Sequence, residues 1–155
     1  MKIFLYRLCQ CTWGLPQTLF GAVVFLICRK HKHYTYRGAV ITEWNMPTSL
    51  SVGMFIFITA RPGSCRRGGR RYGQREVYRR LLVHEYGHTI QSLMLGPLYL
   101  PLVALPSALW CNLPPCKKYR RRSGVSYYTF FTESWADRLG ERVTEEPSMG
   151  RMMNG

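Results

Sequence analysis

The sequence has little negative charge. Its 155 residues include 8 Asp and Glu against 22 Lys and Arg, which gives a formal net charge of +14. Hydrophobic residues nevertheless make up 46% of the chain, so it can build a core and is not disordered throughout. There is no heptad pattern, no collagen period and no repeat of about 20–50 residues, which excludes coiled coils, collagen and solenoids. The length predicts a single domain.

The cysteines form no recognisable ligand pattern. No CxxC pair and no zinc-finger spacing occurs. We therefore predict reduced, structural cysteines. The six are Cys9, Cys11, Cys28, Cys65, Cys111 and Cys116.

The basic residues are concentrated in three runs. Four lie in residues 29–37, eight in 61–80 and five in 117–122. Such runs attract polyanions, either nucleic acid or an anionic membrane surface, or they form a solvated surface that keeps the protein in solution. Tyrosines between the basic residues raise a nucleic-acid-binding hypothesis. We do not expect nucleic acid to be the partner, because nucleic-acid binding leaves the apolar segments without a role.

Residues 11–28 carry no formal charge and are followed directly by a cationic block, RKHKH. Eighteen residues is about the lower limit for crossing a bilayer, and Pro16 interrupts the segment. Two interpretations remain open, a membrane-associated helix, which we favour, or a buried helix that covers the core. Residues 98–111 form a second apolar segment, broken by prolines, which predicts a buried or half-immersed helix.

The remaining patterns predict a helix-dominated α+β fold with a small antiparallel sheet. Residues 39–44 and 50–59 are rich in β-branched and aromatic residues, which predicts an antiparallel pair of strands. Residues 61–74 contain many arginines and glycines and predict a flexible loop. Apolar periodicity predicts helices over 74–95, ended by Gly96-Pro97, and over 126–142.

The chemistry is concentrated in an HExxH motif, His84-Glu85-Tyr86-Gly87-His88. Residues four apart lie on the same side of a helix, so both imidazoles can reach one metal ion. Glu85 lies beside that ion and can accept a proton from a water that the metal acidifies. Gly87 weakens a helix, which predicts that another backbone approaches closely there.

A catalytic zinc site needs a third protein ligand. No histidine follows His88, so we expect a carboxylate, and Glu133 precedes the only aspartate, Asp137, by one helical turn. This spacing predicts that Glu133 binds the metal and that Asp137 accepts a ring N–H from one histidine. The alternative is a solvated helix face on which both carboxylates pair with Arg138 or Arg142.

HExxH followed by ExxxD on a second helix resembles the gluzincin zinc metallopeptidases in a minimal, single-domain form. It is also similar to a group of small bacterial proteins that share the HEYGH string. The resemblance covers about residues 39–141. It implies Zn²⁺ as cofactor, His84, His88 and Glu133 as its ligands, Glu85 as general base, Asp137 as support for the first histidine, and a peptide or protein as substrate.

Several alternatives stay open beside this resemblance. Larger gluzincins carry an oxyanion-stabilising residue for which the sequence offers no motif, and Tyr127, Tyr128 or an arginine before the metal helix are the candidates. HExGH also resembles the intramembrane site-2-type metalloproteases, whose third ligand is an aspartate in an apolar segment. A non-catalytic protein that uses the metal as a clip would need a fourth ligand, such as Cys111 or Cys116.

Together these patterns divide the chain into three parts. We expect an apolar helix with a basic segment over 1–37, which allows association with an anionic membrane surface. A zincin-like domain follows over 38–142, and a flexible tail over 143–155. The predicted location is the cytoplasmic face of a membrane or the cytoplasm.

Overall fold

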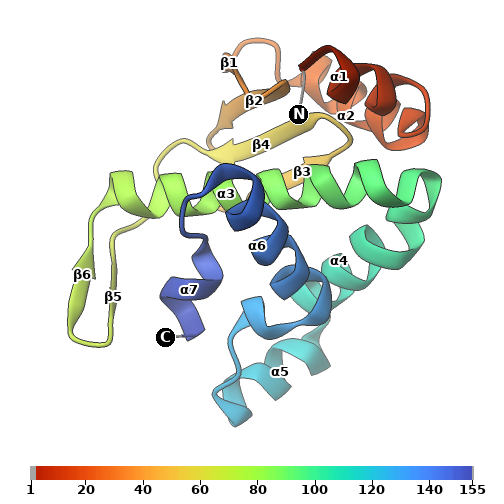
Figure 1. Cartoon of the computed structure of the whole chain (residues 1–155). Helices are drawn as coiled ribbons and strands as arrows, with labels where there is room; N and C mark the ends of the chain where they lie inside the picture. The colour runs from red at the N-terminus through yellow and green to blue at the C-terminus, as the bar shows by residue number, and fades with distance from the viewer. Residues whose placement is uncertain (1–2, 155) are drawn as a thin grey trace.

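The computed structural model describes residues 3–154 and is an α+β domain dominated by helices, as predicted (Figure 1). A mixed four-stranded sheet is packed on a long central helix, and further helices surround that helix. The elements are α1 (Ile3–Cys11), α2 (Leu15–Ile27), β1 (Lys32–Tyr36), β2 (Ala39–Trp44), β3 (Leu50–Val52), β4 (Phe55–Thr59), β5 (Cys65–Arg67), β6 (Arg70–Tyr72), α3 (Gln74–Leu95), η1 (Gly96–Leu98), η2 (Leu100–Ala104), α4 (Leu105–Asn112), α5 (Pro114–Ser123), η3 (Tyr127–Thr129), α6 (Phe131–Thr144) and α7 (Met149–Asn154).

The sheet differs from the predicted antiparallel pair. Residues 50–59 form two strands, because Gly53, with a φ of 60°, reverses the chain between β3 and β4. The strand order is β1-β2-β4-β3, and β2 pairs with β4 in parallel, with Val40 opposite Phe55. The predicted antiparallel pairing of 39–44 with 50–59 is therefore wrong. The turn residues between 44 and 50 do not show that the chain reverses again at Gly53, so that β4 and not β3 pairs with β2.

The two faces of the sheet contact different helices. Ile41, Ile56 and Ile58 are fully buried in one hydrophobic cluster with Leu82 and Tyr86 of α3. On the alternate side of β4, Phe55 meets α2, where its ring centroid lies 5.5 Å from that of Phe25. The sheet and α2 thus hold α3 in a fixed position from one side.

Helix α6 crosses α3 on the other side, at two glycines (Figure 1). A Cβ atom added at Gly87 would overlap the carbonyl oxygen of Ala136, and one added at Gly140 would overlap that of Val83. The close backbone approach predicted at Gly87 is confirmed. It allows side chains of the two helices to meet at short range.

Several polar segments are more ordered than expected. Part of the predicted loop 61–74 forms the β5–β6 hairpin, and residues 114–123 form helix α5. The predicted flexible tail contains α7, whose Met149 and Met152 are buried against Val77. The boundary predicted at residue 37 lies inside the hairpin β1–β2, so residues 32–36 belong to the same sheet as the following strands.

The N-terminal apolar segment is not one helix. It contributes to α1 and α2, which are bent by 97° relative to each other. No helix in residues 3–154 is by itself long and apolar enough to cross a membrane, and α1 and α2 pass that test only as a bent pair.

Candidate metal centre

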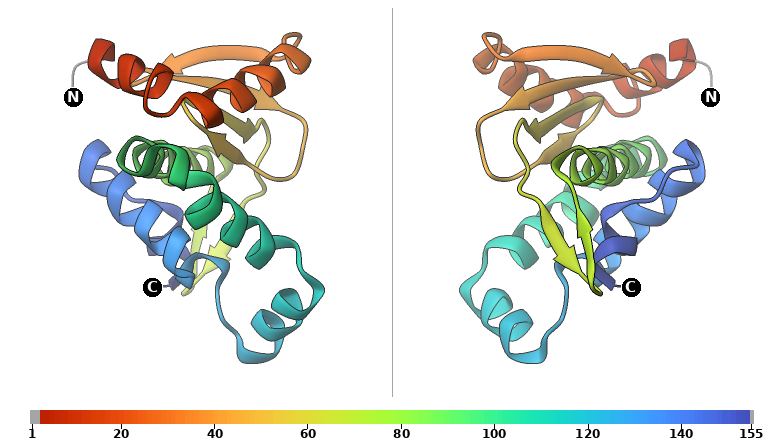
Figure 2. Two further views of the ribbon diagram at one scale, coloured as in Figure 1. Left: turned by 90° about the vertical axis from the view of Figure 1, so that its right-hand side faces the viewer. Right: turned by 90° about the vertical axis from the view of Figure 1, so that its left-hand side faces the viewer.

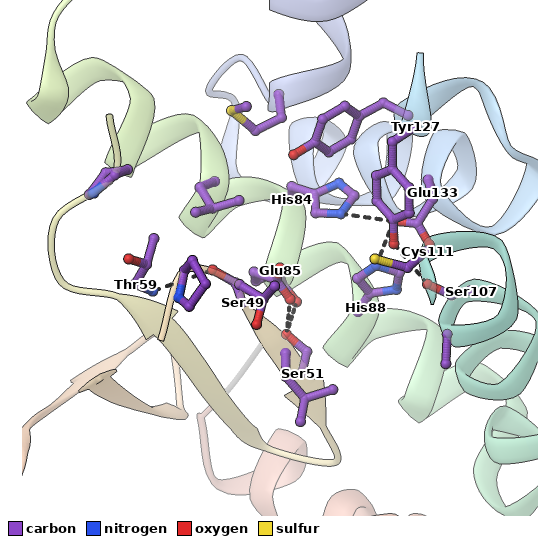
Figure 3. A pocket seen from close by; sticks show the side chains of 18 of the residues that line it. Ser49, Ser51, Thr59, His84, Glu85, His88, Ser107, Cys111, Tyr127 and Glu133 are labelled. Carbon is purple, nitrogen blue, oxygen red and sulfur yellow. Dashed lines mark hydrogen bonds and ion pairs between the residues drawn. The ribbon is translucent and has the colours of Figure 1, made fainter. Parts of the chain in front are cut away.

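Helix α3 presents His84 and His88 one turn apart toward α6 (Figure 3). Both side chains are buried, and their ring centroids lie 4.9 Å apart with the ring planes nearly perpendicular. The hydrophobic residues of the same helix face the sheet, so packing of the core aims the histidines at α6. The helix has the bounds that periodicity predicted.

Glu133, in the first turn of α6, completes the cluster. Its Oε2 atom lies 3.2 Å from Nε2 of His84 and 3.4 Å from Nε2 of His88. The Glu133 side chain is 0% exposed, and Oε2 accepts no hydrogen bond from any described residue. One ligand atom from each of the three residues lies within 4.8 Å of the other two, so this group could bind a metal ion.

Two further side chains contact the outer nitrogen of each histidine. Asp137 Oδ1 lies 3.0 Å from Nδ1 of His84, and Gln91 Oε1 lies 2.7 Å from Nδ1 of His88. Gln91 in turn donates through Nε2 to the carbonyl of Thr132, which orients its amide. Both rings therefore donate from Nδ1 and direct Nε2 toward Glu133, where Nε2 can bind either a proton or a metal ion. When neither Nε2 atom carries a proton, two nitrogen lone pairs and a carboxylate oxygen converge, an arrangement that a proton or a metal ion neutralises.

Asp137 is itself held by the C-terminal helix. The backbone N–H of Gly150 donates to Oδ1 of Asp137 at 3.2 Å, and a side chain at position 150 would overlap Oδ2. The sequence analysis missed both Gln91 and Gly150. Gln91 carries a usable signal, an amide three residues after the second histidine on the same helix, whereas nothing near Gly150 indicates the contact.

Protonation equilibria reflect the same arrangement. Burial disfavours a charged imidazole, but the hydrogen bonds to Asp137 and Glu133 outweigh it and raise the pKa of His84 from 6.5 to about 10. Burial alone would raise the pKa of Glu133, yet its contacts with His84 and His88 hold that pKa well below the usual range. In the absence of a metal, the cluster therefore binds a proton, which a metal would displace.

Glu85 lies beside this cluster and is fixed by the sheet (Figure 3). Its side chain is buried, and Ser51 of β3 donates to Oε2 at 2.6 Å. Tyr99, between η1 and η2, donates to the backbone carbonyl of Ser51 at 3.0 Å. Edge strand β3 thus positions the carboxylate that the motif predicts as a general base, and neither Ser51 nor Tyr99 was predicted.

The cluster opens into a cavity of about 650 Å³. Its walls are β3 with the loop before it, α3, and the segment from η2 through α4. Tyr127 and Tyr128 of η3 line the same cavity, and Tyr127 shares a 3.0 Å hydrogen bond with Ser107. Burial and the nearby carboxylates Glu133 and Glu85 raise the pKa of Tyr127 and of Tyr128, respectively, so both phenols are hydrogen-bond donors at neutral pH.

Cys111 also lines the cavity as a free thiol, but it does not belong to the group of atoms that could bind a metal. Within residues 3–154, the structure places no cysteine in that group. On the side that faces the cavity, the group that could bind a metal is therefore bordered by side chains that do not belong to it.

No protein-family model, no curated protein and no solved structure matches this chain.

Proposed function

We propose that the chain is a zinc-dependent peptidase. The observation that carries the proposal is the convergence of Nε2 of His84, Nε2 of His88 and Oε2 of Glu133 beside a cavity that Glu85 also lines. Two imidazoles and a carboxylate are the donor set of many catalytic zinc sites. Ligands bound tetrahedrally to zinc at their usual lengths lie about 3.3 Å from each other, which agrees with the 3.2 Å and 3.4 Å separations measured here.

The residues around this group have distinct roles in such a reaction. Bound zinc would polarise the scissile carbonyl and lower the pKa of a neighbouring water to about 7. Glu85 takes the proton from the attacking water and returns it to the leaving amine. Ser51 holds one oxygen of Glu85, so the carboxylate keeps its orientation through both transfers. The hydroxyls of Tyr127 and Tyr128 are the available donors for the oxyanion.

The position of Asp137 favours a gluzincin-like arrangement over a site-2-type one. Asp137 contacts the outer Nδ1 atom of His84, whereas Glu133 meets the Nε2 atoms of both histidines. A site-2-type enzyme would instead use an aspartate as its third ligand. An anionic membrane surface is the place of action that we propose for this peptidase, since apolar segments with adjacent basic runs accompany the site.

The proposal is tested by measuring metal content and hydrolysis in parallel. Protein purified without chelators should contain about one zinc per chain by mass spectrometry, and should cleave a quenched-fluorescent peptide library. Glu85→Gln should keep the zinc and slow cleavage by about 10²–10⁴-fold, because the general base is lost. His88→Ala should lose both zinc and cleavage.

Glu76→Gln is the matched control, because it makes the same change on α3 at a residue that pairs with Arg80 and does not line the cavity. It should leave both readouts unchanged. Wild-type protein without zinc, or Glu85→Gln with wild-type activity, would contradict the proposal. If the wild-type protein binds zinc but cleaves no peptide, the alternative in which the metal is a structural clip would be favoured.

A further inference from the structure

Helices α1 and α2 have the reverse of the polarity expected for a helix on the surface of a water-soluble domain. Their buried side chains include Tyr6, Gln10, Gln17 and Thr18. Their large apolar side chains point outward, and Phe4 and Ile27 are 77% and 78% exposed. A helix in contact with water normally turns its apolar side to the core. This reversal requires an apolar environment outside the protein.

The polar side chains tie the helix pair to the core. Gln10 donates to the carbonyl of Thr89 at 3.0 Å, and Gln17 donates to the carbonyl of Gly96 at 2.8 Å. Thr18 donates to the carbonyl of Gln10 at 2.8 Å, which joins α1 to α2. The pair is therefore a fixed part of the domain, and its outward apolar residues are not concealed by another part of the described chain.

A second apolar segment continues the same side of the molecule. The elements η1, η2 and α4 follow the end of α3 on the side turned toward the viewer in the left panel of Figure 2, and η1 contacts α2. We define the apolar face as the exposed apolar residues of α1, α2 and this segment, which include Phe4, Phe20, Ile27, Leu98, Leu102 and Leu109. So large an exposed apolar surface marks an interaction site.

Charge identifies what covers the apolar face. The exposed Arg29 and Lys30 directly follow α2, and the exposed Lys117 and Lys118 lie on α5, directly after α4. Basic side chains next to outward apolar helices are the signature of binding to an anionic bilayer, since the apolar residues enter the lipid and the cations meet its head groups. Trp13, at the bend between α1 and α2, is half exposed, as aromatic residues at a membrane interface are.

We infer that the apolar face is inserted into one leaflet of an anionic bilayer, with α1 and α2 lying in the interface rather than crossing it. The 97° bend and the buried glutamines keep the pair on the domain surface. Of the basic run in residues 61–80, Arg66, Arg67, Arg70 and Arg71 belong to the β5–β6 hairpin, which lies on the other side of the molecule from α4 (Figure 1). It is therefore outside the contact. This inference does not depend on zinc or on hydrolysis.

The test is flotation of the full chain with vesicles of phosphatidylcholine alone, or with one third phosphatidylglycerol, followed across salt concentrations. The chain should float with the anionic vesicles and bind the neutral ones more weakly. Phe20→Ser with Ile27→Ser should abolish flotation on both, whereas Met46→Ser, an equally exposed apolar residue between β2 and β3, should not.

The electrostatic part has its own matched pair. Lys117→Gln with Lys118→Gln should weaken binding to anionic vesicles by roughly 30-fold, at about fivefold per charge. Arg66→Gln with Arg67→Gln, on the β5–β6 hairpin, makes the same change in net charge and should have little effect. Equal effects of the two pairs would overturn the assigned orientation.

Light scattering without lipid tests whether a second copy of the chain, rather than a bilayer, covers the apolar face. If a second copy of the chain covered the apolar face, the wild type would be a dimer, Phe20→Ser with Ile27→Ser would be a monomer, and neither would float. That result overturns the inference, as does wild-type protein that remains below the vesicles at low salt.

Discussion

Helix α3 makes two contacts that bury polar side chains, and they differ in how the polar atoms are used. Against α1 and α2, Gln10 and Gln17 donate to backbone carbonyls of and next to α3. Against α6, Nε2 of His84, Nε2 of His88 and Oε2 of Glu133 face one another, and all three are acceptors unless a proton or a cation lies between them. In the first contact both amide N–H groups have acceptors, although Gln17 Oε1 and the Tyr6 hydroxyl have no partner among the described residues, whereas the second contact needs a proton or a cation between its acceptors.

The difference shows that buried polarity alone does not identify a functional site. A buried amide N–H that donates to a carbonyl has its own hydrogen-bonding need met and serves to attach one element to another. Convergent acceptors are unfavourable unless a positive charge lies between them, so they indicate a ligand. Mutations that remove one side chain from each contact should therefore have different consequences.

The largest effect is expected from Glu133→Ala compared with Gln17→Ala. Glu133→Ala should reduce zinc from about one equivalent to background and abolish peptide cleavage, because a ligand atom is lost. Gln17→Ala should keep the zinc but lower the free energy of unfolding by about 1–3 kcal/mol, because polar groups remain buried without a partner. Metal content and chemical denaturation measure the two readouts. Loss of zinc in Gln17→Ala with its fold intact would remove the distinction between the contacts.

The second prediction concerns pH and applies to the α3–α6 contact alone. Since the pKa of His84 is raised to about 10, the metal-free cluster holds a proton that zinc must displace. The affinity for zinc should therefore fall by about tenfold for each unit by which the pH is lowered, or about a hundredfold from pH 8.5 to pH 6.5. Competition with a chelator at several pH values measures this affinity.

The same shift sets the stability of the metal-free protein. A raised pKa stabilises the folded state fully below pH 6.5, and that contribution is lost as the pH rises toward about 10. Melting temperatures of chelator-treated protein should fall over this range, unlike those of zinc-loaded protein. A zinc affinity independent of pH would show that no proton occupies the cluster.

A smaller effect is expected from Gln91→Ala, which removes the partner of Nδ1 of His88 but no ligand. Zinc affinity should fall by about 10–100-fold, because such partners orient the imidazole and fix its tautomer. Gln91→Glu, which keeps an acceptor for the same nitrogen, should restore most of the affinity. Gln10→Ala, in the other contact, should leave zinc affinity unchanged, and an equal loss in both variants would point to a general loss of stability.

The sequence predicted the parts of the fold that have an apolar periodicity. Helix α3 has the predicted bounds of 74–95, since its core residues recur on one side and Gly96-Pro97 ends it. The pairing of β2 with β4 was missed, because strand order depends on contacts between distant segments rather than on local residues. Helix α5 and the β5–β6 hairpin were missed because their sequences are short and polar, and α7 was missed because six residues show no clear period.

The candidate site was predictable where chemistry imposes a spacing. His84 with His88, and Glu133 with Asp137, are each one helical turn apart, and the structure brings all four together. Ser51, Tyr99 and Gly150 could not be found in this way, since each reaches the site through the fold rather than through a motif. The supporting residues of a centre are thus less visible in a sequence than its ligands.

The segment from η2 through α4 has one further consequence. Val103 and Ser107 line the cavity beside the histidines, whereas Leu102 and Leu109 of the same segment belong to the apolar face. If both proposals hold, this one segment separates lipid from bound peptide, and a tilt of the segment changes both surfaces together. The two binding events are then thermodynamically coupled. If vesicles raise the affinity of the protein for a peptide inhibitor by some factor, the inhibitor must raise its affinity for vesicles by the same factor.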